Sequence, residues 1–172
     1  VKGRLAVFRG DSWQLLLTDP AYGLRAAVYL RACLIAGGLA DSRLAVGVGS
    51  VDHLHSRDVT RSTGEAFSLS GSALDDMKDP ARLVLAVADS PAWPAGLVAA
   101  IGQLCDALIS EWTRRQAEII SHAIHPAEPI HEEIAAVLEP PVSRVAVTRS
   151  LSGAHWQAIR EAIRAFEEFA KE

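Results

Sequence analysis

The sequence predicts an α+β fold in which a small α/β domain is followed by a tail of helices. All segments of strand character lie before residue 92, namely RLAVF, WQLLLT, RLAVGVGS and RLVLAVAD. Segments of helical periodicity lie between some of them. After residue 112 the apolar residues recur only at helical spacing, and prolines interrupt the pattern. We therefore expect an α/β domain over 1–92, a connecting helix over 93–112 and an all-α domain over 113–172.

The α/β domain is predicted to begin with a β-hairpin and to continue as helix, strand, loop, helix and strand. In chain order these elements span 4–8, 13–18, 20–37, 43–50, 52–63, 64–76 and 82–89. Asp11 lies at the hairpin tip, where Asp beside Gly is ordinary turn chemistry. Gly47 and Gly49 alternate with valine in their strand, which indicates close approach by a helix, a backbone or a ligand. The aliphatic run over 82–89 predicts a strand that is buried on both faces.

The connecting helix has one clear apolar stripe. Its members are spaced by three or four residues: Leu97, Ala100, Ile101, Leu104, Leu108 and Trp112. We expect this stripe to be the buried face that joins the two domains. Cys33 and Cys105 lie on apolar faces of predicted helices, so we expect both to be buried free thiols, as in a reducing compartment.

Capping residues and prolines divide the helical tail. Thr113-Arg114-Arg115-Gln116 matches the capping box, in which a hydroxyl and an amide each satisfy an unpaired backbone donor. Pro129 suits the first turn of the second helix, Pro140-Pro141 ends it, and Ser143 and Ser152 are placed to cap the third and fourth helices. The residues expected in the core of the tail are Ala117, Ile120, Ile124, Ile130, Ile134, Ala135, Leu138, Val147, Leu151, Trp156, Ile159, Ile163 and Phe166.

The division of residues 113–151 is typical of a helix-turn-helix, whose third helix presents groups that reach phosphates and base edges. Here the outward positions are Arg144, Thr148 and Arg149, and Arg114 and Arg115 are candidate phosphate contacts. The break before the third helix is about two residues longer than in the common pattern. The alternative is a three-helix bundle used for dimerisation or as a lid, whose arginines form a solvated face.

The charge balance argues against strong DNA binding by a single copy. The chain has a formal net charge of -4 and a pI near 5.9. From Trp112 onward, seven lysine and arginine residues stand against nine aspartate and glutamate residues. Because phosphate neutralisation supplies most of the non-specific affinity, we expect DNA binding only by a homodimer or within a larger assembly.

Other sequence features bear on localisation and on metal binding. No apolar run approaches the ~20 residues that span a bilayer, and no signal-peptide pattern opens the chain, so we expect a cytoplasmic protein without a membrane partner. The histidines of the tail lack a recognised zinc spacing, which predicts surface or capping roles. The polar loop contains Asp52, His53, His55 and Asp58, and we expect these residues to be solvated rather than to form a ligand cluster.

Two short motifs and the order of the elements resemble a known family. The motifs are Gly10-Asp11-Ser12-Trp13-Gln14 at the hairpin and Gly64-Glu65-Ala66-Phe67, followed by Ser70-Gly71, at the second helix. The α/β domain resembles the palm domain of nucleotidyl cyclases and GGDEF proteins. With WTRRQAEII and the helical tail added, the whole chain is similar to the SatD family. The resemblance implies a ferredoxin-like, cyclase-like fold whose first strand lies upstream of Val1.

The resemblance also implies which residues would perform catalysis. Palm-type cyclases hold two divalent ions, Mg²⁺ or Mn²⁺, with one acidic residue on the first strand and one at the hairpin. Asp11 matches the hairpin position, which makes it the candidate metal ligand. Ser68 and Ser72 stand where cyclases have an asparagine and an arginine, and neither can supply a cation.

We therefore expect a DNA-binding transcriptional regulator whose degenerate cyclase-like domain senses a ligand, such as a nucleotide, or dimerises. The alternatives are a metal-dependent nucleotidyl cyclase or transferase centred on Asp11 and a non-catalytic protein interaction module.

Overall fold

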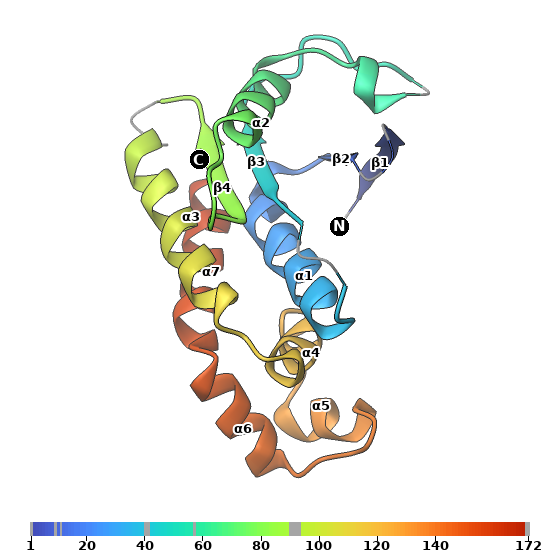
Figure 1. The fold of residues 1–172 in the computed structure, drawn as a ribbon, viewed down its shortest axis with the longest axis vertical. Helices are drawn as coiled ribbons and strands as arrows, with labels where there is room; N and C mark the ends of the chain where they lie inside the picture. The colour runs from blue at the N-terminus through green and yellow to red at the C-terminus, as the bar shows by residue number, and fades with distance from the viewer. Residues whose placement is uncertain are drawn as a thin grey trace.

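The computed structural model of this chain describes residues 2–8, 10, 12–39, 42–56, 58–89 and 94–170. The structure is mixed α+β, and its strands precede most of its helices (Figure 1). The elements are β1 (Gly3–Phe8), β2 (Ser12–Leu17), the 3-10 helix η1 (Pro20–Tyr22), α1 (Gly23–Ala36), β3 (Leu44–Val48), the 3-10 helix η2 (Val59–Arg61), α2 (Glu65–Asp75), β4 (Leu83–Val87), α3 (Ala95–Ser110), α4 (Arg114–Ala123), α5 (His131–Val137), α6 (Arg144–Gly153) and α7 (Trp156–Phe169).

Within the described ranges the strands form two separate two-stranded sheets. β1 and β2 are antiparallel, with Val7 opposite Trp13, which confirms the expected hairpin. β3 and β4 are parallel, with Val46 opposite Leu85. Along β4 fully buried residues alternate with half-buried ones, because α2 and α3 both pack against this strand.

The glycines of β3 mark the close approach of a helix. A Cβ atom at Gly47 would lie 2.2 Å from the carbonyl oxygen of Ala66 and 2.7 Å from the backbone nitrogen of Ser70, both in α2. A Cβ atom at Gly49 would meet the side chain of Glu65 at 2.9 Å. The expectation drawn from the alternating glycines is thus confirmed, and the partner is α2.

The expected buried face of the connecting helix is confirmed only in part: Trp112 is buried and Ile101 and Leu108 pack against the core, but the other three members are exposed. Leu97 and Leu104 are 53% and 68% exposed. The buried stripe of α3 instead consists of Val98, Gly102, Cys105 and Ile109, which have the same spacing. Gly102 decides the orientation, because the absence of a side chain there lets α3 lie directly on Leu85 of β4, where a Cβ atom would come within 2.9 Å.

The helix boundaries of the tail are confirmed in part. Thr113 and Gln116 form the expected capping box, and the Ser143 side chain accepts a hydrogen bond from the backbone nitrogen of Ala146 and caps α6. Ser152 does not cap α7, because α6 continues to Gly153 and the chain turns sharply at His155, whose φ is +53°.

The second helix of the tail begins two residues later than its proline suggested. The carboxylate of Glu133 accepts a hydrogen bond from the backbone nitrogen of Ile130 at 3.0 Å, so α5 starts at His131. Ile130 therefore precedes the helix and is 59% exposed rather than buried. The other residues expected in the core of the tail are buried.

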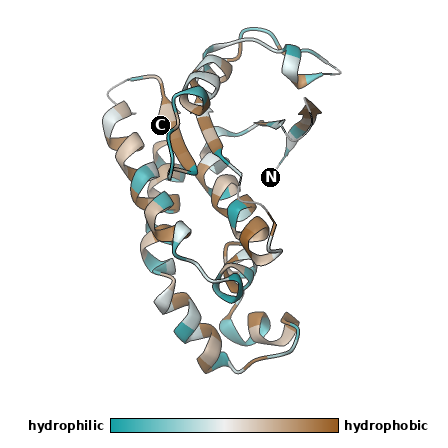
Figure 2. Ribbon diagram, in the orientation of Figure 1, coloured by the Kyte–Doolittle hydropathy of each residue, from teal (hydrophilic) through white to brown (hydrophobic). Residues whose placement is uncertain are grey.

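One hydrophobic core runs through both halves of the chain. Its buried members include Leu24 of α1, Leu85 of β4, Ile109 of α3, Ile120 of α4 and Ile163 of α7. α1 packs against both β3 and α4 and so joins the α/β part to the helical tail. Apolar residues, brown in Figure 2, occur along the helices in both parts. Among the described helices, none is long and apolar enough to cross a membrane.

A buried ion pair and a buried thiol lie beside each other in this core. Arg31 of α1 is fully buried and binds the carboxylate of Asp106 in α3, which also accepts the backbone N–H of Arg82 at 2.9 Å. Burial, and secondarily the charge of Asp106, raises the pKa of the Cys105 thiol to about 11. Cys105 is therefore a buried free thiol, as expected, whereas Cys33 is free but only half-buried.

Candidate nucleic-acid interface

The three short helices α4, α5 and α6 lie at the end of the molecule remote from α2 (Figure 1). α6 packs against α4 and α5 through its buried residues Val147 and Leu151. Residues 138–143 connect α5 to α6, and the buried Leu138 holds this segment against the core. Among the described residues, α6 is thus fixed on one side and free on the other.

The free side of α6 is basic and partly apolar. Arg144, Thr148 and Arg149 are all exposed, as the sequence predicted, and α6 itself contains no acidic residue. Arg144 and Thr148 lie on the side toward α5, where they contact Glu132 and His131, whereas Arg149 points about 100° or more further round the helix. Val145 is also exposed, at 57%. Val145 was not predicted as a site residue, although it lies four residues before Arg149 and therefore on the same side of the helix.

The polar groups of this face differ in how firmly they are held. The Arg144 guanidinium forms an ion pair with Glu132 of α5, with 3.2 Å between Nε and Oε1. The Thr148 hydroxyl donates to the backbone oxygen of Arg144 at 3.1 Å and lies 2.9 Å from Nδ1 of His131. Arg149 forms no hydrogen bond or ion pair with any residue that the structure describes. Its guanidinium is therefore ready to bind an external group.

Arg114 and Arg115 do not join this face. Arg115 donates to the backbone oxygen of Pro140 at 2.9 Å and pairs with Glu118 at 2.6 Å, so it holds the segment between α5 and α6 against α4. The exposed Arg114 points toward the end of α1, where a Cβ atom at Gly38 would lie 2.6 Å from its Cζ. Of the two residues expected as phosphate contacts, Arg115 therefore positions the segment before α6, and Arg114 lies toward α1, away from α6.

A buried hydrogen bond fixes the far end of α6. The indole N–H of Trp112, which follows α3, donates to the backbone oxygen of Ala154 at 3.0 Å. Trp112 and Ala154 are both buried. Because a lost partner would leave a buried polar group unsatisfied, this bond holds the corner between α6 and α7 against the body of the protein.

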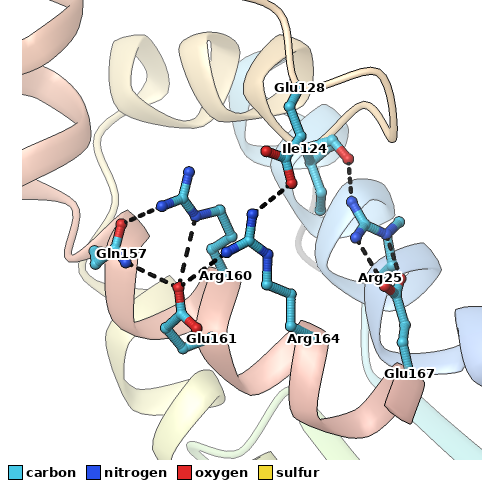
Figure 3. Close-up of polar contacts among 8 residues, drawn as sticks. All are labelled: Arg25, Ile124, Glu128, Gln157, Arg160, Glu161, Arg164 and Glu167. Carbon is cyan, nitrogen blue, oxygen red and sulfur yellow. Dashed lines mark hydrogen bonds and ion pairs between the residues drawn. The ribbon is translucent and has the colours of Figure 1, made fainter.

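A second tie joins α1 to the helices that surround α6. Arg25 of α1 binds Glu167 of α7 through two nitrogens, at 2.5 and 3.1 Å, and donates to the backbone oxygen of Ile124 at 2.6 Å (Figure 3). The Arg25 guanidinium, the Glu167 carboxylate and the Ile124 carbonyl meet at the junction of α1, α7 and the end of α4. The orientation of the tail relative to α1 is thus fixed by directional bonds in addition to apolar packing.

Much of the acidic charge of the tail is paired away from α6. Arg164 of α7 binds Glu128 at 2.6 Å and Glu161 at 3.4 Å, and Figure 3 shows this group beside Arg160. The Arg164 guanidinium lowers the pKa of the Glu128 carboxyl through a hydrogen bond and its charge. Glu128 and Glu161 are thus paired on the side of α7, and Glu132 is the carboxylate paired at α6.

The candidate metal ligand Asp11 lies outside the described residues, so the structure does not test the expected Mg²⁺ or Mn²⁺ site. Ser68 and Ser72 are exposed on α2. Across the described ranges, no group of three or more His, Cys, Asp or Glu residues is arranged to hold a metal ion. In the polar loop, His55 accepts the backbone N–H of Asp58 at 3.1 Å, and Asp58 accepts that of Thr60 at 3.0 Å, so these side chains satisfy the loop's own backbone.

No protein-family model matches this chain, and no curated protein or solved structure matches it either.

Proposed function

We propose that this chain is a cytoplasmic DNA-binding transcriptional regulator of the SatD type. In this proposal α5 and α6 form a helix-turn-helix with α6 as the recognition helix, and the ferredoxin-like, cyclase-like α/β part senses a nucleotide or dimerises. The observation that carries the proposal is the free side of α6. The exposed positions of α6 are two arginines, a threonine and a valine, with Glu132 of α5 as the carboxylate paired there, while the opposite side is anchored in the core.

The chemistry of this side suits the major groove of DNA. An arginine donates two parallel hydrogen bonds to guanine or binds a phosphate, and a threonine or an aliphatic group contacts the methyl group of thymine. Arg149, which has no partner among the described residues, is the first candidate for such a bond. Thr148 and Val145 supply methyl groups beside it.

The rigid mounting of α6 supports the same function. Base recognition requires a helix whose side chains are held in register by phosphate contacts and by the protein itself. Arg115 fixes the segment that precedes α6, and Trp112 fixes the segment that follows it. A helix that served only as a solvated surface would not need both anchors.

The test is selection of binding sites from random double-stranded DNA, followed by titration of a labelled selected duplex by fluorescence anisotropy. We expect an enriched sequence motif and an affinity that falls steeply as salt rises, because phosphate contacts release counterions. Combined Arg144→Ala and Arg149→Ala should weaken binding by about 30-fold or more, at about 1–3 kcal/mol for each contact.

The matched control removes two exposed positive charges elsewhere, by Arg61→Ala with Lys78→Ala, and should bind almost as the wild type does. Equal loss in both double variants would show that only overall charge matters. That result, or the absence of any enriched sequence, would refute the proposed function.

A further inference from the structure

The outer face of α3, formed by Leu97, Ala100, Leu104 and Ala107, is uncovered among the described residues. The two leucines are 53% and 68% exposed, and both alanines are exposed. The only charged residue of α3 is Asp106, and it is buried against Arg31 on the other side. α3 is thus apolar on both its inner and its outer face, a pattern that is typical of a helix covered on all sides.

α7 is a surface helix of the same chain, and its solvent-exposed side is charged. It buries one apolar stripe and presents charged residues such as Glu161, Arg164 and Glu168 on the other side. α3 has sixteen residues and α7 fourteen, so the two helices are similar in length but differ in the charge of their outer faces. The contrast indicates that the outer face of α3 is a contact surface rather than a solvated one.

We propose that the outer face of α3 is the contact between two copies of this chain, packed antiparallel about a two-fold axis. A two-fold contact brings a patch against itself, so the patch must be self-complementary. An uncharged face meets this condition because no like charges are brought together.

The alternation of large and small residues favours the antiparallel arrangement. When Leu97 of one copy lies opposite Ala107 of the other, Ala100 lies opposite Leu104, and each leucine fills the space above an alanine. The exposed Glu111 at the end of α3 then lies near the N-terminus of the other α3, where the helix dipole favours a negative charge. In a parallel pair the two copies of Glu111 would repel each other.

The size of the surface sets the expected strength. A helix of 16 residues is about 24 Å long, and one face of it buries on the order of 400 Å² per copy. A stable contact buries about 800 Å² per partner. We therefore expect a reversible dimer with a dissociation constant of about micromolar magnitude.

Another apolar surface lies at the hairpin, on the opposite side of the molecule from α3 in Figure 1. It is a groove of about 320 Å³ lined by Leu5, Val7, Trp13, Leu15 and Leu30. A dimer formed through α3 leaves this groove open. Leu5, which is exposed like Leu104, therefore supplies a matched control.

The test is sedimentation velocity of the full chain over a range of about 1–100 µM, which brackets the expected dissociation constant. Wild type should shift from monomer to dimer. Leu104→Glu should raise the dissociation constant at least tenfold with an unchanged circular dichroism spectrum, and Leu5→Glu should leave the constant unchanged. A wild-type monomer at all concentrations, or dimer loss with Leu5→Glu and not with Leu104→Glu, would overturn the proposal.

Cysteine cross-linking in a Cys33→Ser background tests the orientation. Leu97→Cys combined with Ala107→Cys should form a disulfide-linked dimer under mild oxidation, whereas Leu97→Cys alone should not. Efficient cross-linking of Leu97→Cys alone would mean a parallel contact and would contradict the antiparallel arrangement. None of these measurements involves DNA, so their outcome is independent of the proposed function.

Discussion

At the scale of single residues, Arg144 and Arg149 differ in whether their guanidinium groups have an ion-pair partner. Arg149 has no partner among the described residues, whereas Arg144 is paired with Glu132 at 3.2 Å. Both members of this pair are largely exposed, and an exposed ion pair contributes only about 0–1 kcal/mol. DNA would therefore compete with Glu132 for Arg144 at modest cost.

This competition gives a prediction of tighter binding. Glu132→Gln should lower the dissociation constant for the selected duplex by a few-fold, roughly up to fivefold, because Arg144 is released and a carboxylate near the phosphates is removed. Anisotropy titration at low salt measures the change. Asp75→Asn on α2 makes the same change in net charge far from α6 and should have little effect. Weaker binding of Glu132→Gln would mean that the ion pair orders Arg144 for DNA rather than competing with it.

The residue scale also shows what sequence can and cannot predict. The exposure of Arg144, Thr148 and Arg149 follows from the helical spacing of the buried residues of α6 and was predicted correctly. The role of Arg115 depends on its bond to Pro140, a residue 25 positions away, and no local pattern contains that information. The role of Asp11 as a metal ligand stays a prediction.

At the scale of elements, glycines decide which helix faces lie on the sheet. Gly47 allows α2 to approach β3, and Gly102 allows α3 to approach β4. The first contact could be predicted because the glycines alternate with valine. The second could not, because α3 has two apolar stripes of equal spacing, and only the position of β4 shows which of them is covered.

The contact at Gly47 gives a stability prediction with an internal control. Gly47→Ala should lower the free energy of unfolding by about 1–3 kcal/mol or more, because a Cβ atom would lie 2.2 Å from a backbone oxygen of α2. Gly71→Ala, within α2, meets nothing within 4 Å and should raise stability by about 0.5–1 kcal/mol. Urea unfolding followed by circular dichroism measures both. Equal effects of the two variants would argue against close packing of α2 on β3.

At the scale of the whole molecule, the helical tail and the α/β part share one core. Arg25 and the apolar face of α1 contact α4 and α7, and both of these helices contact α6. The sequence predicted the order of strands and helices in both parts. It did not predict the shared core, because the contacts between α1 and α4 join residues nearly a hundred positions apart.

The proposed dimer adds a consequence at this scale. α4, α5 and α6 all follow α3 in the chain and lie beyond its C-terminal end (Figure 1). An antiparallel contact through α3 therefore places the two α6 helices at opposite ends of the dimer. We expect such a dimer to engage two separated DNA sites rather than two adjacent half-sites.

DNA recognition by α6 is tested most directly by site-specific photo-cross-linking to the selected duplex. In a Cys33→Ser background, Val145→Cys on α6 and Ser72→Cys on α2 are each modified with a photoreactive group and irradiated with DNA. Both positions are exposed, so both are modified alike. Our prediction is that the α6 probe cross-links to bases of the selected duplex and that the α2 probe does not. Cross-linking from α2 alone, or from neither position while the DNA is bound, would contradict it.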